Sequence, residues 1–194
     1  MKRSIKTVPF LILLFLLIFS VPVSANVASP RKQVKKTVTS FMKKARKMNV
    51  KKMEKYFMNQ GQKVFTDPKK FYRMIRPYTK KMTWKIKKIK IKGNQAKVKI
   101  RIDFQSLYLC YWNSLLQTYQ HASNRDEPPK NKKYFLKILQ QEIDKNGGKE
   151  VRTTTNLRLR KEGGKWKFTK PKETLMNVLY CDYIYAVQDF MGEE

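Results

Sequence analysis

The sequence predicts an α+β fold in which N-terminal helices pack on a strongly bent, cone-like antiparallel sheet, with a helical insertion and a C-terminal helix. Residues 82–104, MTWKIKKIKIKGNQAKVKIRIDF, alternate apolar and cationic side chains around Gly93-Asn94, which is typical of a hairpin. LRLRKEGGKWKF, at 157–168, repeats the pattern around Gly163-Gly164. The segments before, between and after these hairpins have helical apolar spacing. Helices followed by antiparallel strands indicate the α+β class.

The first 25 residues predict a signal peptide. Basic residues precede the apolar run VPFLILLFLLIFS (8–20), and VSA ends at Ala25, so we expect cleavage before Asn26. The run is shorter than the roughly 20 apolar residues that span a bilayer. A retained N-terminal membrane anchor is the alternative. The protein is therefore predicted to be secreted or associated with the cell envelope, with residues 26–194 forming a single domain.

Two or three helices are predicted before the first hairpin. Ser29 followed by Pro30 is typical of a capped helix start, and Asn49 can cap a second, short helix. TDPKK (66–70) predicts the start of a third helix, which Pro77 should end or kink. Each helix carries one apolar stripe that can cover one side of the sheet.

The register of the first hairpin predicts a β-bulge. Pairing outward from the turn puts Lys90 opposite Lys97 on one face. Continued alternation would place Ile86 opposite Arg101 and mix the two faces, because a one-residue slip turns every side chain over. One extra residue at Lys87-Lys88 restores the order, and such an insertion also bends the strand.

The second hairpin predicts the same one-sided charge. Leu159 pairs with Phe168 on the inner face, and Arg160 pairs with Lys167 on the outer face. Like charges that face one another across a ladder are destabilising, which favours a surface selected for anions. The predicted polyanion-binding residues are Lys85, Lys87, Lys88, Lys90, Lys92, Lys97, Lys99, Arg101, Arg158, Arg160, Lys165 and Lys167.

The helical insertion is expected at 106–148, as two helices joined by a polar loop, and one last helix is expected at about 172–191. The chain has two cysteines, Cys110 and Cys181. In an exported protein they could form one disulfide, and two buried thiols are the alternative.

The order of these segments resembles that of secreted bacterial proteins of the nuclear transport factor two-like superfamily, the cystatin-like cones. The segments that carry the resemblance are SPRKQVKKTVTSFMKKARKMNVKKMEKYF, WKIKKIKIKGNQAKVKIRIDF, the variable helical piece and LRLRKEGGKWKF. The resemblance implies a bent sheet closing over helices, often with an internal pocket. Members include enzymes and many binding or assembly modules, so the fold does not fix the function. The long C-terminal helix and the lack of a lipid-attachment cysteine depart from the family pattern.

No catalytic residue, metal site or cofactor is predicted. The inward strand positions are apolar, and the only histidine, His121, lies beside a polar loop. Two cysteines and one histidine do not make an ordinary zinc site. Tyrosines and tryptophans cluster in the insertion and the last helix, where they indicate either ordinary core or an amphipathic pocket. The candidate pocket residues are Trp84, Tyr108, Trp112, Trp166, Tyr180 and Tyr183.

Charge gives the strongest indication of function. The chain has 44 Lys and Arg against 14 Asp and Glu, a net charge of +30, which favours polyanionic partners. Lysine predominates over arginine, which favours diffuse attraction over stereospecific phosphate contacts. The outer faces lack interleaved aromatic residues, which argues against nucleic acid. A compositional bias toward lysine is the alternative origin of the charge.

The sequence therefore predicts an exported, non-enzymatic binding or interaction protein. Its expected partner is an anionic cell-wall polymer, a membrane surface with acidic lipid headgroups, or an acidic protein. The alternative is a small-molecule carrier or enzyme that uses the interior of the cone.

Overall fold

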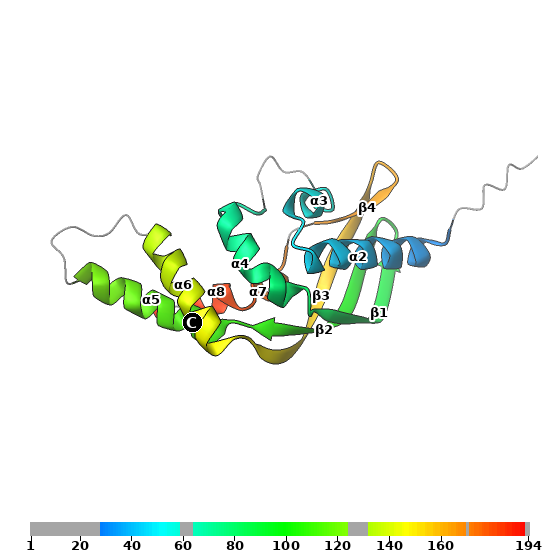
Figure 1. Ribbon diagram of the computed structural model, residues 1–194. Coiled ribbons are helices and arrows are strands. Elements are labelled where there is room, and N and C mark those ends of the chain that lie inside the picture. Colours follow the sequence, from blue (N-terminus) through cyan, green and yellow to red (C-terminus); the bar gives the residue numbers. More distant parts are fainter. Residues whose placement is uncertain (1–27, 59–63, 124–131, 170, 193–194) are drawn as a thin grey trace, which may run out of the picture.

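The computed structural model describes residues 28–58, 64–123, 132–169 and 171–192. The predicted signal peptide, 1–25, and its cleavage site lie outside the described residues. In chain order the elements are α2 (Pro30–Arg46), α3 (Val50–Glu54), α4 (Lys69–Thr79), β1 (Thr83–Lys92), β2 (Gln95–Ser106), α5 (Tyr108–Ser123), α6 (Lys132–Asn146), β3 (Lys149–Glu162), β4 (Lys165–Phe168), α7 (Glu173–Leu179) and α8 (Tyr183–Met191). The α+β prediction is confirmed: helices precede a four-stranded antiparallel sheet, and helices end the described chain (Figure 1).

The first two N-terminal helices, α2 and α3, begin at the predicted caps, whereas α4 begins after Pro68 without a side-chain cap. The backbone N–H of Lys32 donates to Ser29 Oγ at 3.4 Å, and that of Lys52 donates to Asn49 Oδ1 at 3.2 Å. These side chains satisfy N–H groups that have no partner inside the helix. The third helix, α4, continues through Pro77 and ends at Thr79, so the proline lies in its last turn.

The sheet has the order β1-β2-β3-β4 and does not close on itself. Strand pairing confirms the predicted register, with Lys90 opposite Lys97, and it places the bulge between Ile86 and Lys88. Lys87 is therefore the extra residue. Beyond Lys87 the side chains of β1 alternate between the two faces as before. The one inserted residue therefore keeps the charged side chains on one face.

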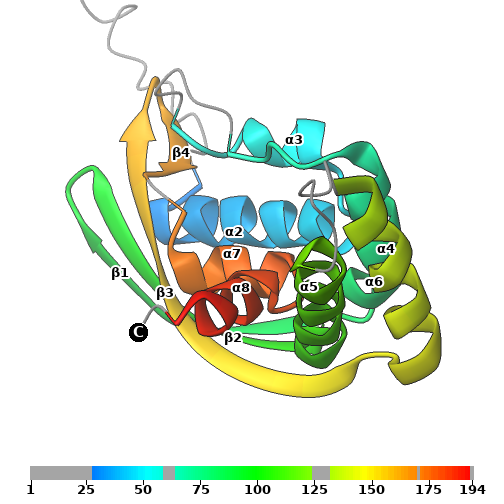
Figure 2. The ribbon, with the colours of Figure 1, turned by 90° about the vertical axis from the view of Figure 1, so that its left-hand side faces the viewer.

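The sheet is strongly bent, and helices lie on its concave side (Figure 2). Residues of both layers, such as Phe41 and Ile100, form the buried core. There α2 lies against the sheet and α7 lies beside it, while Phe41 of α2 packs on Phe168 of β4 with ring centroids 4.7 Å apart. The segment after α3 is hydrogen-bonded to β4: Phe168 N donates to Tyr56 O at 2.8 Å, and Met58 N donates to Phe168 O at 2.9 Å. Aromatic burial and backbone hydrogen bonds thus join the N-terminal helices to the edge of the sheet.

The insertion forms a helical pair, α5 and α6, that extends away from the end of the sheet (Figure 1). Its two helices meet at Glu142, a buried carboxylate. Glu142 accepts hydrogen bonds from Asn113 Nδ2 at 2.8 Å, Gln117 Nε2 at 3.0 Å and Asn146 Nδ2 at 2.9 Å. These hydrogen bonds offset the free-energy cost of removing the carboxylate from water.

The prediction of one continuous C-terminal helix is wrong. The chain leaves the helix between α7 and α8, where Cys181 and Asp182 have φ of 53° and 72°. The cause is tertiary: Leu107 N donates to Cys181 O at 2.8 Å, and Tyr111 Oη donates to Tyr180 O at 2.9 Å. Donors at the start of α5 therefore bind carbonyl groups that would accept backbone hydrogen bonds within a continuous helix.

This break also moves Asp182 from the polar helix face, where the sequence placed it, into the protein. Its side chain is buried and accepts a hydrogen bond from Asn177 Nδ2. Burial raises the pKa of Asp182 above its usual value, although hydrogen bonds from Ser106 and Asn177 lower it in part. The charged form of this carboxyl is thus less favourable in the folded protein than in the unfolded chain.

Asp182→Asn should remove an acid-range pH dependence of stability. Because the folded pKa lies above the unfolded one, the folded state binds more protons in that window, and stability falls as pH rises through it. Asparagine keeps the acceptor and tolerates the left-handed backbone. Urea unfolding across the acid range should show a smaller fall with rising pH for the variant, and equal slopes for both proteins would contradict the assignment.

Candidate functional site

The outward-facing side chains of the sheet form rows of cations on its convex side. One row runs Lys90, Lys97 and Arg158 across three strands, because Lys97 pairs with both of the others. Lys85 faces Arg101 in a second row. In Figure 2 the described helices lie on the concave side and leave the convex side uncovered. We call the following residues the cationic face: Lys85, Lys88, Lys90, Lys92, Lys97, Lys99, Arg101, Arg158, Arg160 and Lys167.

Acidic residues on the convex side lie mainly at the end away from the hairpin tips. Asp103 accepts a hydrogen bond from Arg152 Nε, and this bond holds the pKa of the Asp103 carboxyl below its usual range. Arg101 Nε lies 3.6 Å from the other carboxylate oxygen. At the opposite end, Glu162 pairs with Lys167 Nζ at 2.7 Å. Between these two places, the rows described above contain cations and neutral residues.

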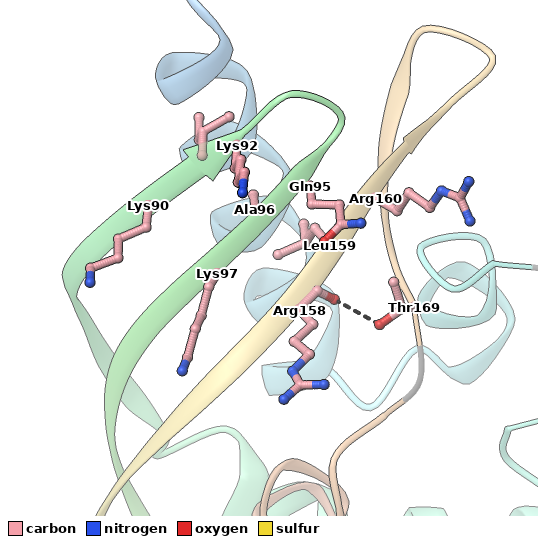
Figure 3. A pocket seen from close by; sticks show the side chains of 10 residues that line it. Lys90, Lys92, Gln95, Ala96, Lys97, Arg158, Leu159, Arg160 and Thr169 are labelled. Atoms are coloured by element: carbon pink, nitrogen blue, oxygen red, sulfur yellow. Dashed lines mark hydrogen bonds between the residues drawn. The ribbon is translucent and has the colours of Figure 1, made fainter.

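A hollow of about 700 Å³ lies over β1, β2 and β3 near the hairpin tips. Lys90, Lys97 and Arg158 extend from neighbouring strands in Figure 3. The chain after β4 closes one side, because Thr169 N donates to Arg158 O at 3.1 Å. The hollow is therefore cationic and has a fixed backbone frame.

Two predicted polyanion-binding residues lie outside these rows. Lys165 is exposed at the tip of the β3–β4 hairpin. Lys87, the bulge residue, lines a hollow of about 340 Å³ between β1 and the start of α2, where it meets Arg31, Lys32 and Lys35. The contribution of α2 could not be predicted from the sequence, because alternation within a strand gives no information on which helix lies beside it.

The structure does not bring the six candidate pocket residues together. Tyr108 stacks on Trp112 along α5, with ring centroids 6.4 Å apart. Tyr180 and Tyr183 pack around Phe71 instead, at 5.8 and 5.4 Å. The other two residues, Trp84 and Trp166, lie on β1 and β4.

The concave side of the sheet is occupied by side chains. Trp166 is 5% exposed and Phe168 is 2% exposed, and both belong to the buried hydrophobic core. Trp84 is partly buried against the same core. This packing fills space that a carrier or an enzyme would need in the interior of a cone.

The two cysteines are free thiols in the structure, not a disulfide. Cys110 Sγ lies 3.3 Å from Gly147 O and 3.5 Å from Glu142 O, so its single S–H can donate to either carbonyl. Burial raises the pKa of Cys110 to about 11 and raises that of Cys181 as well. Both thiols are therefore protonated at neutral pH and poorly reactive.

His121 stacks on Tyr134 with ring centroids 4.2 Å apart and is half-buried. Among the described residues, no group of three or more His, Cys, Asp or Glu side chains is arranged to hold a metal ion. Within the same residues, no helix has both the length and the apolar character to cross a membrane. Leu109, Leu116 and Tyr119 form an exposed apolar stripe on α5 that the sequence analysis did not identify.

Comparison with known proteins gives no family for this chain. No family model matches it, and no curated protein matches it in sequence.

Proposed function

We propose that the protein is exported and binds an anionic polymer of the cell envelope through the cationic face, without catalysing a reaction. The observation that carries this proposal is the row Lys90, Lys97 and Arg158, in which three like charges lie side by side on neighbouring strands. Such an arrangement is destabilising by itself. A bound chain of negative charges would compensate the repulsion and release counterions.

The shape of the sheet supports a polymer over a flat membrane. The cationic face is convex, so a planar bilayer would contact only part of it. A flexible chain can follow the curvature and contact successive rows. Lysine, which predominates here, is a flexible point charge suited to such loose contacts.

The likeness to cystatin-like cones and the N-terminal segment support the remaining parts of the proposal. A bent sheet over helices is the architecture that the resemblance implies, and residues 1–25 have the layout of an export signal. Phosphate-rich wall polymers would supply the required density of negative charge outside the cell.

Retention on purified cell-wall material tests the proposal. Exposed charges are screened over about 8 Å at physiological ionic strength and about 3 Å at 1 M. We therefore expect residues 26–194 to be retained at low salt and released well below 1 M salt. Retention that is unchanged at about 1 M salt would contradict the proposal.

Two further measurements distinguish the partner. Co-sedimentation with vesicles of phosphatidylglycerol, without retention on wall material, would assign the face to a membrane. Capture of an acidic protein, without either of these, would assign it to protein–protein contact. Either result would overturn the proposal that the partner is an anionic wall polymer.

A further inference from the structure

A third hollow, also of about 340 Å³ but distinct from the one beside Lys87, lies at the β4 edge of the sheet, away from the row Lys90, Lys97 and Arg158. It is formed by three segments that are distant in sequence: α2, the end of the α3 region and the β3–β4 hairpin. Its lining residues are Gln33, Lys36, Thr37, Lys55, Tyr56, Gly164, Lys165, Trp166 and Lys167. Every charged residue in this set is a lysine.

The walls of this hollow are held by the backbone rather than by the lysines. Tyr56 O accepts from Phe168 N at 2.8 Å, which fixes the α3 region against β4. Pairing of Lys167 with Arg160 fixes β4 against β3. The lysine side chains can therefore move without loss of the surrounding frame, as a binding site requires.

Trp166 gives an independent indication of a ligand. Its side chain is 5% exposed and lines the hollow. Its indole Nε1–H has no hydrogen-bond partner among the described residues. A buried donor without an acceptor costs roughly 1–3 kcal/mol, so most buried indoles have a partner.

A negatively charged acceptor would satisfy both the lysines that line the hollow and the unpaired indole N–H of Trp166. Of the four lysines, Lys167 is paired with Glu162, and the other three have no ion pair among the described residues. A phosphate group has several strong acceptor oxygens, so it can accept from ammonium groups and from an indole N–H together. A single carboxylate has fewer acceptor positions for donors that arrive from three directions.

We propose that this hollow binds a phosphate group, with Lys36, Lys55 and Lys165 as the charged ligands and the Trp166 indole N–H as the neutral donor. Because Nε1 is itself buried, side chains that line the hollow must move for a phosphate oxygen to reach it. The three lysine ligands and the indole donor are not members of the cationic face, so the site would remain if the face bound nothing. Lys167 belongs to the face and also lines the hollow, but it is not one of the proposed ligands.

NMR of the indole N–H groups tests the site directly, with tripolyphosphate as the probe. The chain has three tryptophans, so each indole signal can be assigned with a Trp→Phe variant. We expect the Trp166 signal to move downfield and to saturate, while those of Trp84 and Trp112 stay in place. Sodium chloride at matched ionic strength should not reproduce the shift. A Trp166 signal that does not move, or that moves equally with chloride, would overturn the proposal.

Three variants make the test specific. Lys36→Gln, Lys55→Gln and Lys165→Gln together should weaken tripolyphosphate binding by about tenfold or more. The same number of changes on α6, Lys132→Gln, Lys133→Gln and Lys137→Gln, should leave it unchanged. Trp166→Phe should weaken binding by about tenfold, since it removes one donor to a charged group and keeps most of the ring. Equal losses in the site and control variants would indicate general charge attraction and overturn the site.

The same titration separates this site from the proposed function. Backbone amide signals of Lys97 and Arg158 report on the cationic face, and the Trp166 indole reports on the hollow. Movement of the face signals alone overturns the phosphate site and leaves the proposed function standing. Movement of the indole alone supports the site and contradicts the use of the face for this polyanion.

Discussion

Lys90→Glu, Lys97→Glu and Arg158→Glu, introduced together, should reduce affinity for the wall polymer by about 100-fold or more. One basic residue near an anionic surface contributes about 1 kcal/mol, and about 1.4 kcal/mol corresponds to a factor of ten. Loss of three such contacts therefore accounts for roughly 100-fold, and the new negative charges add repulsion. The slope of log affinity against log salt concentration should also fall by roughly 2, at about 0.7 per lost contact for a single-stranded polyanion.

The matched control carries the same charge change on exposed lysines of α6: Lys132→Glu, Lys133→Glu and Lys137→Glu. It should bind almost as well as the unchanged protein, because its substitutions lie outside the cationic face. Unfolding in urea should show that both variants remain folded. If the two variants lose affinity equally, binding depends on net charge alone, and the ordered face has no particular role.

Phe168→Ala should destabilise the fold by about 3–5 kcal/mol, the usual cost of removing a large buried aromatic side chain. Phe168 is 2% exposed and packs against Phe41 and Phe57, with ring centroids 4.7 and 5.5 Å away. It joins the α2 and α3 region to the edge strand β4, so its loss leaves a cavity at the junction of two layers.

The urea midpoint measures this effect, and Leu109→Ala on α5 is the control. Leu109 is 63% exposed, so its removal should cost less than about 0.5 kcal/mol. A cost below about 1 kcal/mol for Phe168→Ala would show that the N-terminal helices do not depend on this contact.

Strand pairing could be predicted because each strand repeats a two-residue pattern. The conflict between Ile86 and Arg101 could be resolved in only one simple way, and the register confirms the bulge there. The cationic rows followed from the same pattern, since the two faces of a strand alternate.

The missed features depend on contacts between segments that are distant in sequence. The apolar spacing of the last helix continues across Cys181, yet the helix breaks there because Leu107 N donates to Cys181 O. Likewise, Lys36 and Lys55 meet Trp166 only because the α3 region is fastened to β4. Periodicity within one segment contains no information about such tertiary contacts.

The bulged strand β1 has a further consequence for self-association. As the first strand in the sheet order it is an edge strand, and edges of this kind can recruit a strand from another molecule and start aggregation. Lysines along β1 and the irregularity at Lys87 oppose such recruitment, because two copies would bring like charges together across a broken ladder. Neutralisation of these lysines by a polymer would weaken that protection. Protein molecules bound along one polymer should therefore approach one another more closely than they do in free solution.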